Sequence, residues 1–325
     1  MKTLILHIGA NKTGSSAIQT FLRLNATDLT RSAVFVAPSD LSLDGEISGQ
    51  HVWFIEELLS DIPTGRRRIA RRLDKLMAGL PEGARLLISA ENLSNGTGAE
   101  RVFAGLSEIY DVQVLFYIRR QDELLLSSWQ QWESKINGDF WAWLTNCVGI
   151  RGDWRAVLQE WENVVPSKNI TVRIYERSRM PDGDVIADFA QAIGLSEHLS
   201  ELKMPEGVVN ASYADAVVEL AKGNPALFRD KHDNDFYNAV EQLTEGRYHR
   251  NPRESVITHE QRCAILGRYA EGNEWVRAHY FPDLAELFVL PKRSDYAVLD
   301  GDGIEARKWE LAASLIFGIA KRVLR

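Results

Sequence analysis

Apolar residues in the first 200 positions fall into short runs that predict β-strands. The run 112–118 is apolar on both faces, as in a strand buried inside a parallel sheet. The predicted strands are 3–9, 34–37, 85–90, 112–118 and 170–175. The intervening segments carry apolar residues at helical spacing, and the predicted helices are 15–25, a segment ending near 79, 100–110, 121–136, one after Trp154, and 184–194.

Strands that alternate with helices predict an α/β fold, here a P-loop-like parallel sheet flanked by helices. From about residue 212 the pattern is mainly helical. We therefore expect one domain over 1–325, with a core at about 1–195 and a helical C-terminal portion at about 196–325. The stretch 304–325 is amphipathic with a basic end, and such a helix packs on its own protein or a partner subunit more often than on a membrane. The sequence predicts no oligomeric state.

Composition narrows the function classes. The chain has 325 residues, 45% apolar and 26% charged, which suits a globular protein with a substantial core. Its net charge of -7 argues against a general nucleic-acid binder but allows a small anion at a local basic cluster. Cys147 and Cys263 form no metal-ligand pattern. Since no apolar window reaches membrane-span length and no signal peptide is evident, we expect a cytoplasmic, bacterial protein with no transmembrane segment.

The segment 7–16, HIGANKTGSS, joins the first predicted strand to the first predicted helix. Free N–H groups and the helix dipole favour an anion at such a helix start. Lys12 adds a positive charge, and the segment also contains Thr13, Gly14, Ser15 and Ser16. The simpler interpretation is a tight turn that needs glycine, with His7 as a structural or loop-supporting residue.

The order of residues in this loop differs from that of nucleoside-triphosphate loops. Those loops place lysine after the last glycine, as GK[ST], whereas Lys12 precedes Gly14 here. No magnesium-binding aspartate ends the strands at 85–90 and 112–118. A kinase or other phosphoryl-transfer enzyme is therefore an alternative hypothesis, and a non-catalytic nucleotide-binding module is another.

A second candidate phosphate site follows the strand 112–118. Arg119 ends this strand, and Ser127 lies eight residues further on, in the next predicted helix. Arginine binds phosphate through a planar fork of donors, and a serine hydroxyl can reach the same group. Arg120 is the second candidate for the arginine role. In the structural alternative, both arginines pair with Asp122 or Glu123.

The loop and the Arg-x7-Ser spacing together resemble sulfotransferases that use 3′-phosphoadenosine 5′-phosphosulfate (PAPS). Their 5′-phosphosulfate loop runs Pro-Lys-Ser/Thr-Gly-Thr-Thr; Asn11 and Ala17 depart from the usual proline or glutamine and the usual aromatic residue. The resemblance implies PAPS as co-substrate and no metal requirement. It places Lys12, Thr13, Gly14, Ser15 and Ser16 at the phosphosulfate, and Arg119 and Ser127 at the 3′-phosphate.

The resemblance also implies a general base, which in this family is histidine or glutamate. Glu91, directly after the strand 85–90, and His51, in the loop after the second strand, are the candidates, with Lys12 stabilising the leaving group. Glu91 is alternatively a helix N-terminal carboxylate, and His51 a satisfied core histidine. Family tendency and a cluster of tryptophans between Trp129 and Trp154 favour an acceptor hydroxyl on a carbohydrate or glycolipid.

Overall fold

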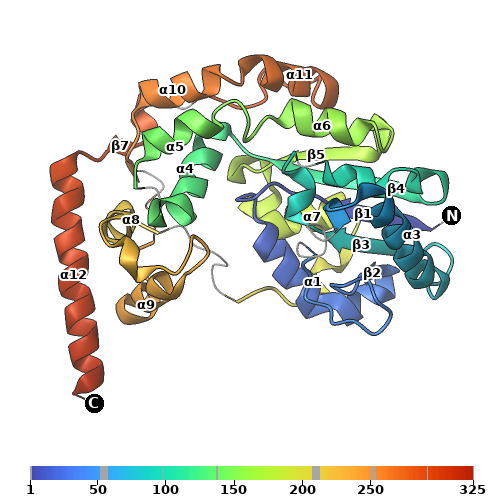
Figure 1. The fold of residues 1–325 in the computed structure, drawn as a ribbon, viewed down its shortest axis with the longest axis horizontal. Coiled ribbons are helices and arrows are strands. Elements are labelled where there is room, and N and C mark those ends of the chain that lie inside the picture. The colour runs from blue at the N-terminus through green and yellow to red at the C-terminus, as the bar shows by residue number, and fades with distance from the viewer. Residues whose placement is uncertain are drawn as a thin grey trace. The chain divides into compact units, whose positions relative to one another are not determined.

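The computed structural model describes residues 2–51, 58–96, 98–136, 138–206, 213–249, 251, 254–290 and 292–324 (Figure 1). By their contacts, the described residues divide into two compact units. Unit 1 consists of Met1–Arg120, Gly152–Val209 and Glu271–Leu287, and unit 2 of Gln121–Arg151, Asn210–Ala270 and Phe288–Arg325. The helical part of the chain is thus not confined to the expected 196–325, and the expected single domain stays a prediction.

Within the described residues, unit 1 is built on a sheet of five parallel strands in the order β2-β3-β1-β4-β5. The strands are β1 (Thr3–His7), β2 (Val34–Val36), β3 (Arg85–Ser89), β4 (Asp111–Ile118) and β5 (Ile170–Ile174). Each coincides with a predicted strand to within two residues at either end. The α/β fold with a parallel sheet is therefore confirmed.

Side chains alternate between the two faces of this sheet, and both faces are covered. Leu115 and Tyr117 of β4 belong to a core cluster with Phe21 of α1 (Ser15–Leu29) and Phe189 of α7 (Val185–Ala192). Phe116, between them, packs edge-on against Trp154 of α6 (Trp154–Glu162). This double burial explains the uninterrupted apolar run that predicted β4. The described helices of unit 1 include α1 (Ser15–Leu29), α3 (Ile62–Ala78), α6 (Trp154–Glu162), α7 (Val185–Ala192) and, from Glu271 on, α11 (Ala270–Tyr280).

The helix expected over 100–110 is wrong. The segment forms two short 3-10 turns, Ala99–Phe103 and Leu106–Glu108. Ala104 between them has a ψ of 135° and Gly105 a φ of 85°, and neither conformation continues a helix. The apolar residues there, including Val102 and Phe103, are buried in the core without forming an α-helix.

The described residues of unit 2 are mainly helical, as the sequence predicts. The helices are α4 (Gln121–Gln131), α5 (Phe140–Cys147), α8 (Asp215–Lys222), α9 (Asp235–Thr244), α10 (His259–Gly267) and α12 (Gly301–Val323). A short parallel pair, β6 (Glu254–Ser255) and β7 (Ala297–Val298), accompanies them. The helix expected over 121–136 ends at Gln131 and continues as a 3-10 turn, Glu133–Lys135. No helix in the described part of the chain is long and apolar enough to cross a membrane.

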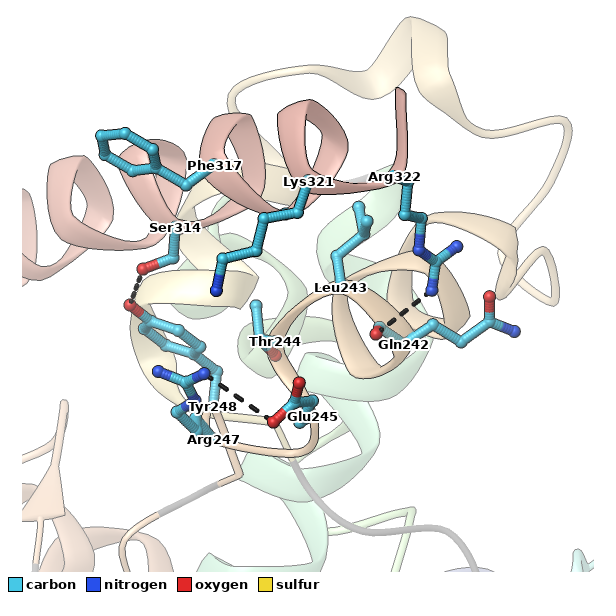
Figure 2. A pocket seen from close by; sticks show the side chains of 11 residues that line it. Gln242, Leu243, Thr244, Glu245, Arg247, Tyr248, Ser314, Phe317, Lys321 and Arg322 are labelled. Atoms are coloured by element: carbon cyan, nitrogen blue, oxygen red, sulfur yellow. Dashed lines mark hydrogen bonds and ion pairs between the residues drawn. The ribbon is translucent and has the colours of Figure 1, made fainter. Parts of the chain in front are cut away.

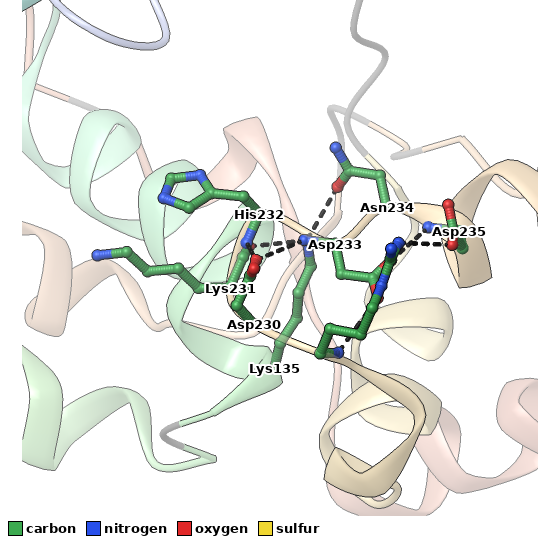
Figure 3. Close-up of polar contacts among 8 residues, drawn as sticks. Lys135, Asp230, Lys231, His232, Asp233, Asn234 and Asp235 are labelled. Carbon is green, nitrogen blue, oxygen red and sulfur yellow. Dashed lines mark hydrogen bonds and ion pairs between the residues drawn. The ribbon is translucent and has the colours of Figure 1, made fainter. Parts of the chain in front are cut away.

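Lys135 is a fully buried lysine in unit 2, and Figure 3 shows it reaching the turn between Asp230 and Asp235. Its Nζ donates to the Lys231 carbonyl at 3.0 Å and to Asn234 Oδ1 at 2.9 Å. The ammonium also lies 5.1 Å from the ring centroid of Tyr237. Burial lowers the pKa of Lys135 to about 8, against the opposing effect of two nearby aspartates. Lys135 therefore ties this turn to the end of α4 with an internal cation.

Replacing Lys135 with methionine should change how stability depends on pH. Because the folded pKa lies below the value of about 10.4 for a free lysine, folded Lys135 loses its proton before the unfolded chain does. Between pH 8 and 10 the wild type should therefore gain up to about 1.4 kcal/mol per pH unit relative to Lys135→Met. Urea unfolding of both proteins at pH 7.5, 8.5 and 9.5 measures this gain, and pH profiles that run parallel would contradict it.

Candidate active site

The loop between β1 and α1 adopts a constrained backbone. Lys12 has a φ of 67° and Gly14 a φ of 81°, both in the left-handed region. This region is uncommon for a residue with a side chain, and a lysine held there indicates local strain that its surroundings sustain. Thr13 is buried and its hydroxyl donates to the Ala10 carbonyl at 2.5 Å. The loop is thus held in one shape by its own contacts.

The start of α1 is suited to an anion. Among the described residues, no side chain caps its N-terminus, and its first turn contains no acidic residue. The first backbone N–H groups of a helix lack intrahelical partners, and they carry the positive end of the helix dipole. Ser15 and Ser16 add hydroxyl groups at the same place. These features leave the start of α1 able to accept an anion, and the anion-binding role of the loop stays a prediction.

Gly14 is packed too closely to accept a side chain. A Cβ at this position would lie 2.9 Å from Cε2 of Tyr175 and 3.0 Å from both γ-methyl groups of Val185. Tyr175 directly follows β5, and Val185 begins α7. These two residues form a wall behind the loop that sequence reasoning missed, although Tyr175 ends the predicted strand 170–175 at the same edge of the sheet.

Gly14→Ala should destabilise the protein through two effects. A left-handed backbone conformation costs a residue with a Cβ roughly 1–3 kcal/mol. The total loss should be larger, because the added methyl group also collides with Tyr175 and Val185. Gly83→Ala is the matched control, since Gly83 has a φ of 76° and no described atom lies within 4 Å of the added Cβ. Chemical unfolding of both variants separates the two effects. Equal losses of stability at the two positions would show that Tyr175 and Val185 move aside to accommodate the methyl group at no cost.

The strand order places this loop at a topological switch point. β1 connects toward β2 on one side of the sheet, and its neighbour β4 connects toward β5 on the other. Ligands of open α/β sheets bind at the carboxyl ends of the strands where the order diverges in this way. Arg119 follows β4, and its Nη1 donates to the Lys12 carbonyl at 2.9 Å. Its guanidinium also lies 5.5 Å from the ring centroid of Tyr175.

Glu91 lies at the same edge, two residues beyond the end of β3. Burial raises the pKa of its carboxyl above the usual range, against a hydrogen bond from the Ser15 side chain and the positive charge of Lys12. The structure thus brings together Lys12, Ser15 and Glu91, three residues that the sequence assigned to one site. A carboxylate with a raised pKa beside a lysine has the properties of a general base.

His51 is placed differently. It is completely buried, with Nε2 2.9 Å from the Ala37 carbonyl and Nδ1 3.2 Å from the Ser89 backbone N–H. A neutral imidazole with its proton on Nε2 satisfies both contacts. Burial lowers the pKa of His51, which favours this neutral form. The imidazole thereby fastens the chain after β2 to the end of β3, and this geometry favours the structural interpretation of His51.

A buried polar network that sequence reasoning missed lies beneath the loop. The Nδ1 atom of His7 is 2.8 Å from Ser89 Oγ, which also accepts a hydrogen bond from Gln19 at 3.2 Å. His7 Nε2 has no hydrogen-bond partner among the described residues, and a Cβ on Gly9 would lie 2.6 Å from it. Burial lowers the pKa of His7 to about 3 and keeps the ring neutral. His7 and Ser89 are cross-strand partners, a register that no local pattern reveals.

Ser127, the predicted second ligand of the 3′-phosphate, is buried in α4. It belongs to unit 2 whereas Arg119 belongs to unit 1, so their joint action on one phosphate stays a prediction. Asp122 and Glu123, the alternative partners proposed for the arginines, lie 2.5 and 2.7 Å from Nη1 of Arg262.

Comparisons with known proteins give distant matches. No family model matches the sequence. A curated relative, an uncharacterised protein from Archaeoglobus fulgidus, is 29% identical over 172 residues, which are 52% of this chain and 46% of the relative. The chain thus spans about half the length of that relative. The crystal structure of a sulfotransferase from Alicyclobacillus acidocaldarius aligns with 70% of this chain and 95% of that chain, at 14% identity and a TM-score of 0.38. A likeness at this level carries no argument about activity.

Proposed function

We propose that this protein is a sulfotransferase that moves a sulfuryl group from PAPS to an acceptor hydroxyl on a carbohydrate or glycolipid. The observation that carries the proposal is the loop at the end of β1, in which Lys12 precedes Gly14 and has both Arg119 and Glu91 beside it. A lysine in this position supplies positive charge to an anionic leaving group, and sulfuryl transfer involves less charge than phosphoryl transfer.

In this proposal the start of α1 holds the 5′-phosphosulfate, with Thr13, Ser15 and Ser16 as supporting residues. The acceptor oxygen forms a bond to sulfur while the bond from sulfur to the bridging phosphate oxygen breaks. Lys12 stabilises the charge that develops on that bridging oxygen. Glu91 takes the proton of the acceptor hydroxyl, because its raised pKa brings it closer to the operating pH. Arg119 and Ser127 hold the 3′-phosphate.

The carbohydrate acceptor depends partly on the tryptophan cluster. Trp129 and Trp154 are buried in the protein core, whereas Trp141 is 42% exposed. Trp141 is therefore the member of this group whose ring is open to a sugar, and its part in acceptor binding stays a prediction. Incubation with labelled PAPS and a panel of oligosaccharides and glycolipids tests the acceptor class, and Trp141→Ala should raise the KM for the acceptor without weakening nucleotide binding.

Calorimetric titration with adenosine 3′,5′-bisphosphate, ADP and ATP tests the nucleotide. The proposal expects the bisphosphate to bind most tightly without magnesium, and Arg119→Ala to weaken it by about tenfold or more, as for a charged hydrogen bond. Arg31→Ala, at an arginine whose side chain is 79% exposed, is the matched control. Ser127→Ala should also weaken binding, and Ser128→Ala should not. A preference for magnesium–ATP would instead support a phosphoryl-transfer enzyme.

A further inference from the structure

Helix α12 presents a second apolar face that no described residue of unit 2 covers. One side of the helix packs against α8 and α9 through the buried Leu311 and the partly buried Leu315. On the other side Trp309, Ile316 and Val323 are 66%, 67% and 78% exposed. Phe317 and Leu324 extend this face, with 69% and 86% exposure. So much contiguous apolar surface on one helix indicates an interaction site.

The residues of this face follow the spacing of a helix-pairing seam. The exposed positions Ala306, Trp309, Ala313, Ile316, Ala320 and Val323 are separated alternately by three and four residues. This is the heptad spacing of two helices that pack along their length. Small and large residues also alternate, because each alanine is followed three residues later by tryptophan, isoleucine or valine. We define these six residues as the α12 seam.

We propose that the α12 seam pairs with the α12 seam of a second copy of this chain, in an antiparallel two-fold dimer. In an antiparallel pair, the positions that hold alanine in one helix lie opposite the positions that hold a large residue in the other. Each alanine then faces a large residue, which fills the space that the alanine leaves. A bilayer requires no such alternation of small and large residues.

Charges at the edge of the seam favour the antiparallel direction. Glu310 and Lys321 are eleven residues apart, close to three helical turns, so they lie on the same edge. Figure 2 shows Lys321 over a pocket of about 640 Å³ between the end of α9 and α12, where Arg247 also lies. Lys321 makes no hydrogen bond or ion pair with any residue that the structure describes.

In an antiparallel pair centred between Ala313 and Ile316, Lys321 comes beside Glu310 of the partner subunit. In a parallel pair this edge of one helix would face the opposite edge of the other, so Lys321 and Glu310 of the partner subunit would lie on different sides of the seam. The exposed surface is also large enough for an interface. Two aromatic and three aliphatic side chains of this face are largely exposed, and their combined area is of the order of the roughly 800 Å² that each partner contributes to a standard interface.

Sedimentation velocity tests the proposal with the full chain of 36.7 kDa. The wild type should sediment as a dimer at tens of micromolar, and Ile316→Glu should raise the dissociation constant by about 100-fold or more, because two carboxylates enter an apolar seam. Ile150→Glu is the matched control, since Ile150 is 76% exposed in unit 2 outside α12. It should leave the dimer intact. Circular dichroism verifies that both variants stay folded.

Charge reversal tests the direction of the pair. Glu310→Lys and Lys321→Glu should each weaken the dimer, and the double variant should restore it. A monomeric wild type at 100 µM would overturn the proposal, as would a dimer that Ile316→Glu leaves unchanged. Binding of the monomer to phosphatidylcholine–phosphatidylserine vesicles, lost in Ile316→Glu, would assign the face to a membrane surface instead.

Discussion

Lys12→Gly is expected to lose nucleotide binding and sulfuryl transfer without loss of stability. Lys12 sits at a φ of 67°, which glycine adopts at no steric cost. The change therefore removes the charge and relieves the backbone together. Affinity for adenosine 3′,5′-bisphosphate should fall by about 10- to 100-fold, as for a charge-assisted contact. Transfer should fall by a further factor of about 10² to 10³, because Lys12 acts mainly on the leaving group.

Calorimetry, transfer of the labelled sulfuryl group from PAPS to an acceptor, and thermal unfolding measure the three quantities. Ala33→Gly is the matched control, because Ala33 has a φ of 56° outside the loop. It should show the same relief of strain with normal binding and transfer. If Lys12→Gly bound the bisphosphate and transferred sulfate at wild-type levels, Lys12 would have no part in the site.

Glu91→Gln is expected to lower the transfer rate by about 10²- to 10⁴-fold, the usual contribution of a general base. Affinity for the bisphosphate should stay the same or rise, because a negative charge next to Lys12 is removed. In the wild type the rate should increase with pH through the raised pKa of Glu91, since only the carboxylate accepts a proton. This acidic limb should be absent from the pH–rate profile of Glu91→Gln.

His51→Ala is the informative comparison for the base. It removes a side chain bonded to the backbone of Ala37 and Ser89, so the free energy of unfolding should fall while each folded molecule keeps its transfer rate. If Glu91→Gln were fully active and His51→Ala stable but inactive, His51 would be the general base and Glu91 would have no catalytic role.

The sheet was predictable because parallel strands buried on both faces leave apolar runs that stand out without knowledge of their neighbours. The failure at 100–110 has the opposite cause, since apolar spacing there reports burial while Gly105 interrupts the helix. The division into two units was not predictable either. It depends on α4 and α5 joining residues almost a hundred positions later in the chain.

The candidate site was predictable only where it is local. Lys12, Gly14 and Ser15 are contiguous, and Glu91 and Arg119 each follow a recognisable strand. His51 was a candidate because of its residue type, and only its two backbone contacts reveal a structural use. Ser89 and Tyr175 enter the site through strand order and register, which one sequence does not state.

The contact between Arg119 and the Lys12 carbonyl joins residues 107 positions apart. A segment containing only residues 1–30 would hold every residue of the loop, yet it would lack Arg119, the support from Ser89 and the wall formed by Tyr175 and Val185. The conformation of the loop therefore depends on residues that are distant in the sequence. Grafting it onto another α/β protein should transfer its sequence without its shape, and a match confined to these ten residues elsewhere is weak evidence of the same chemistry.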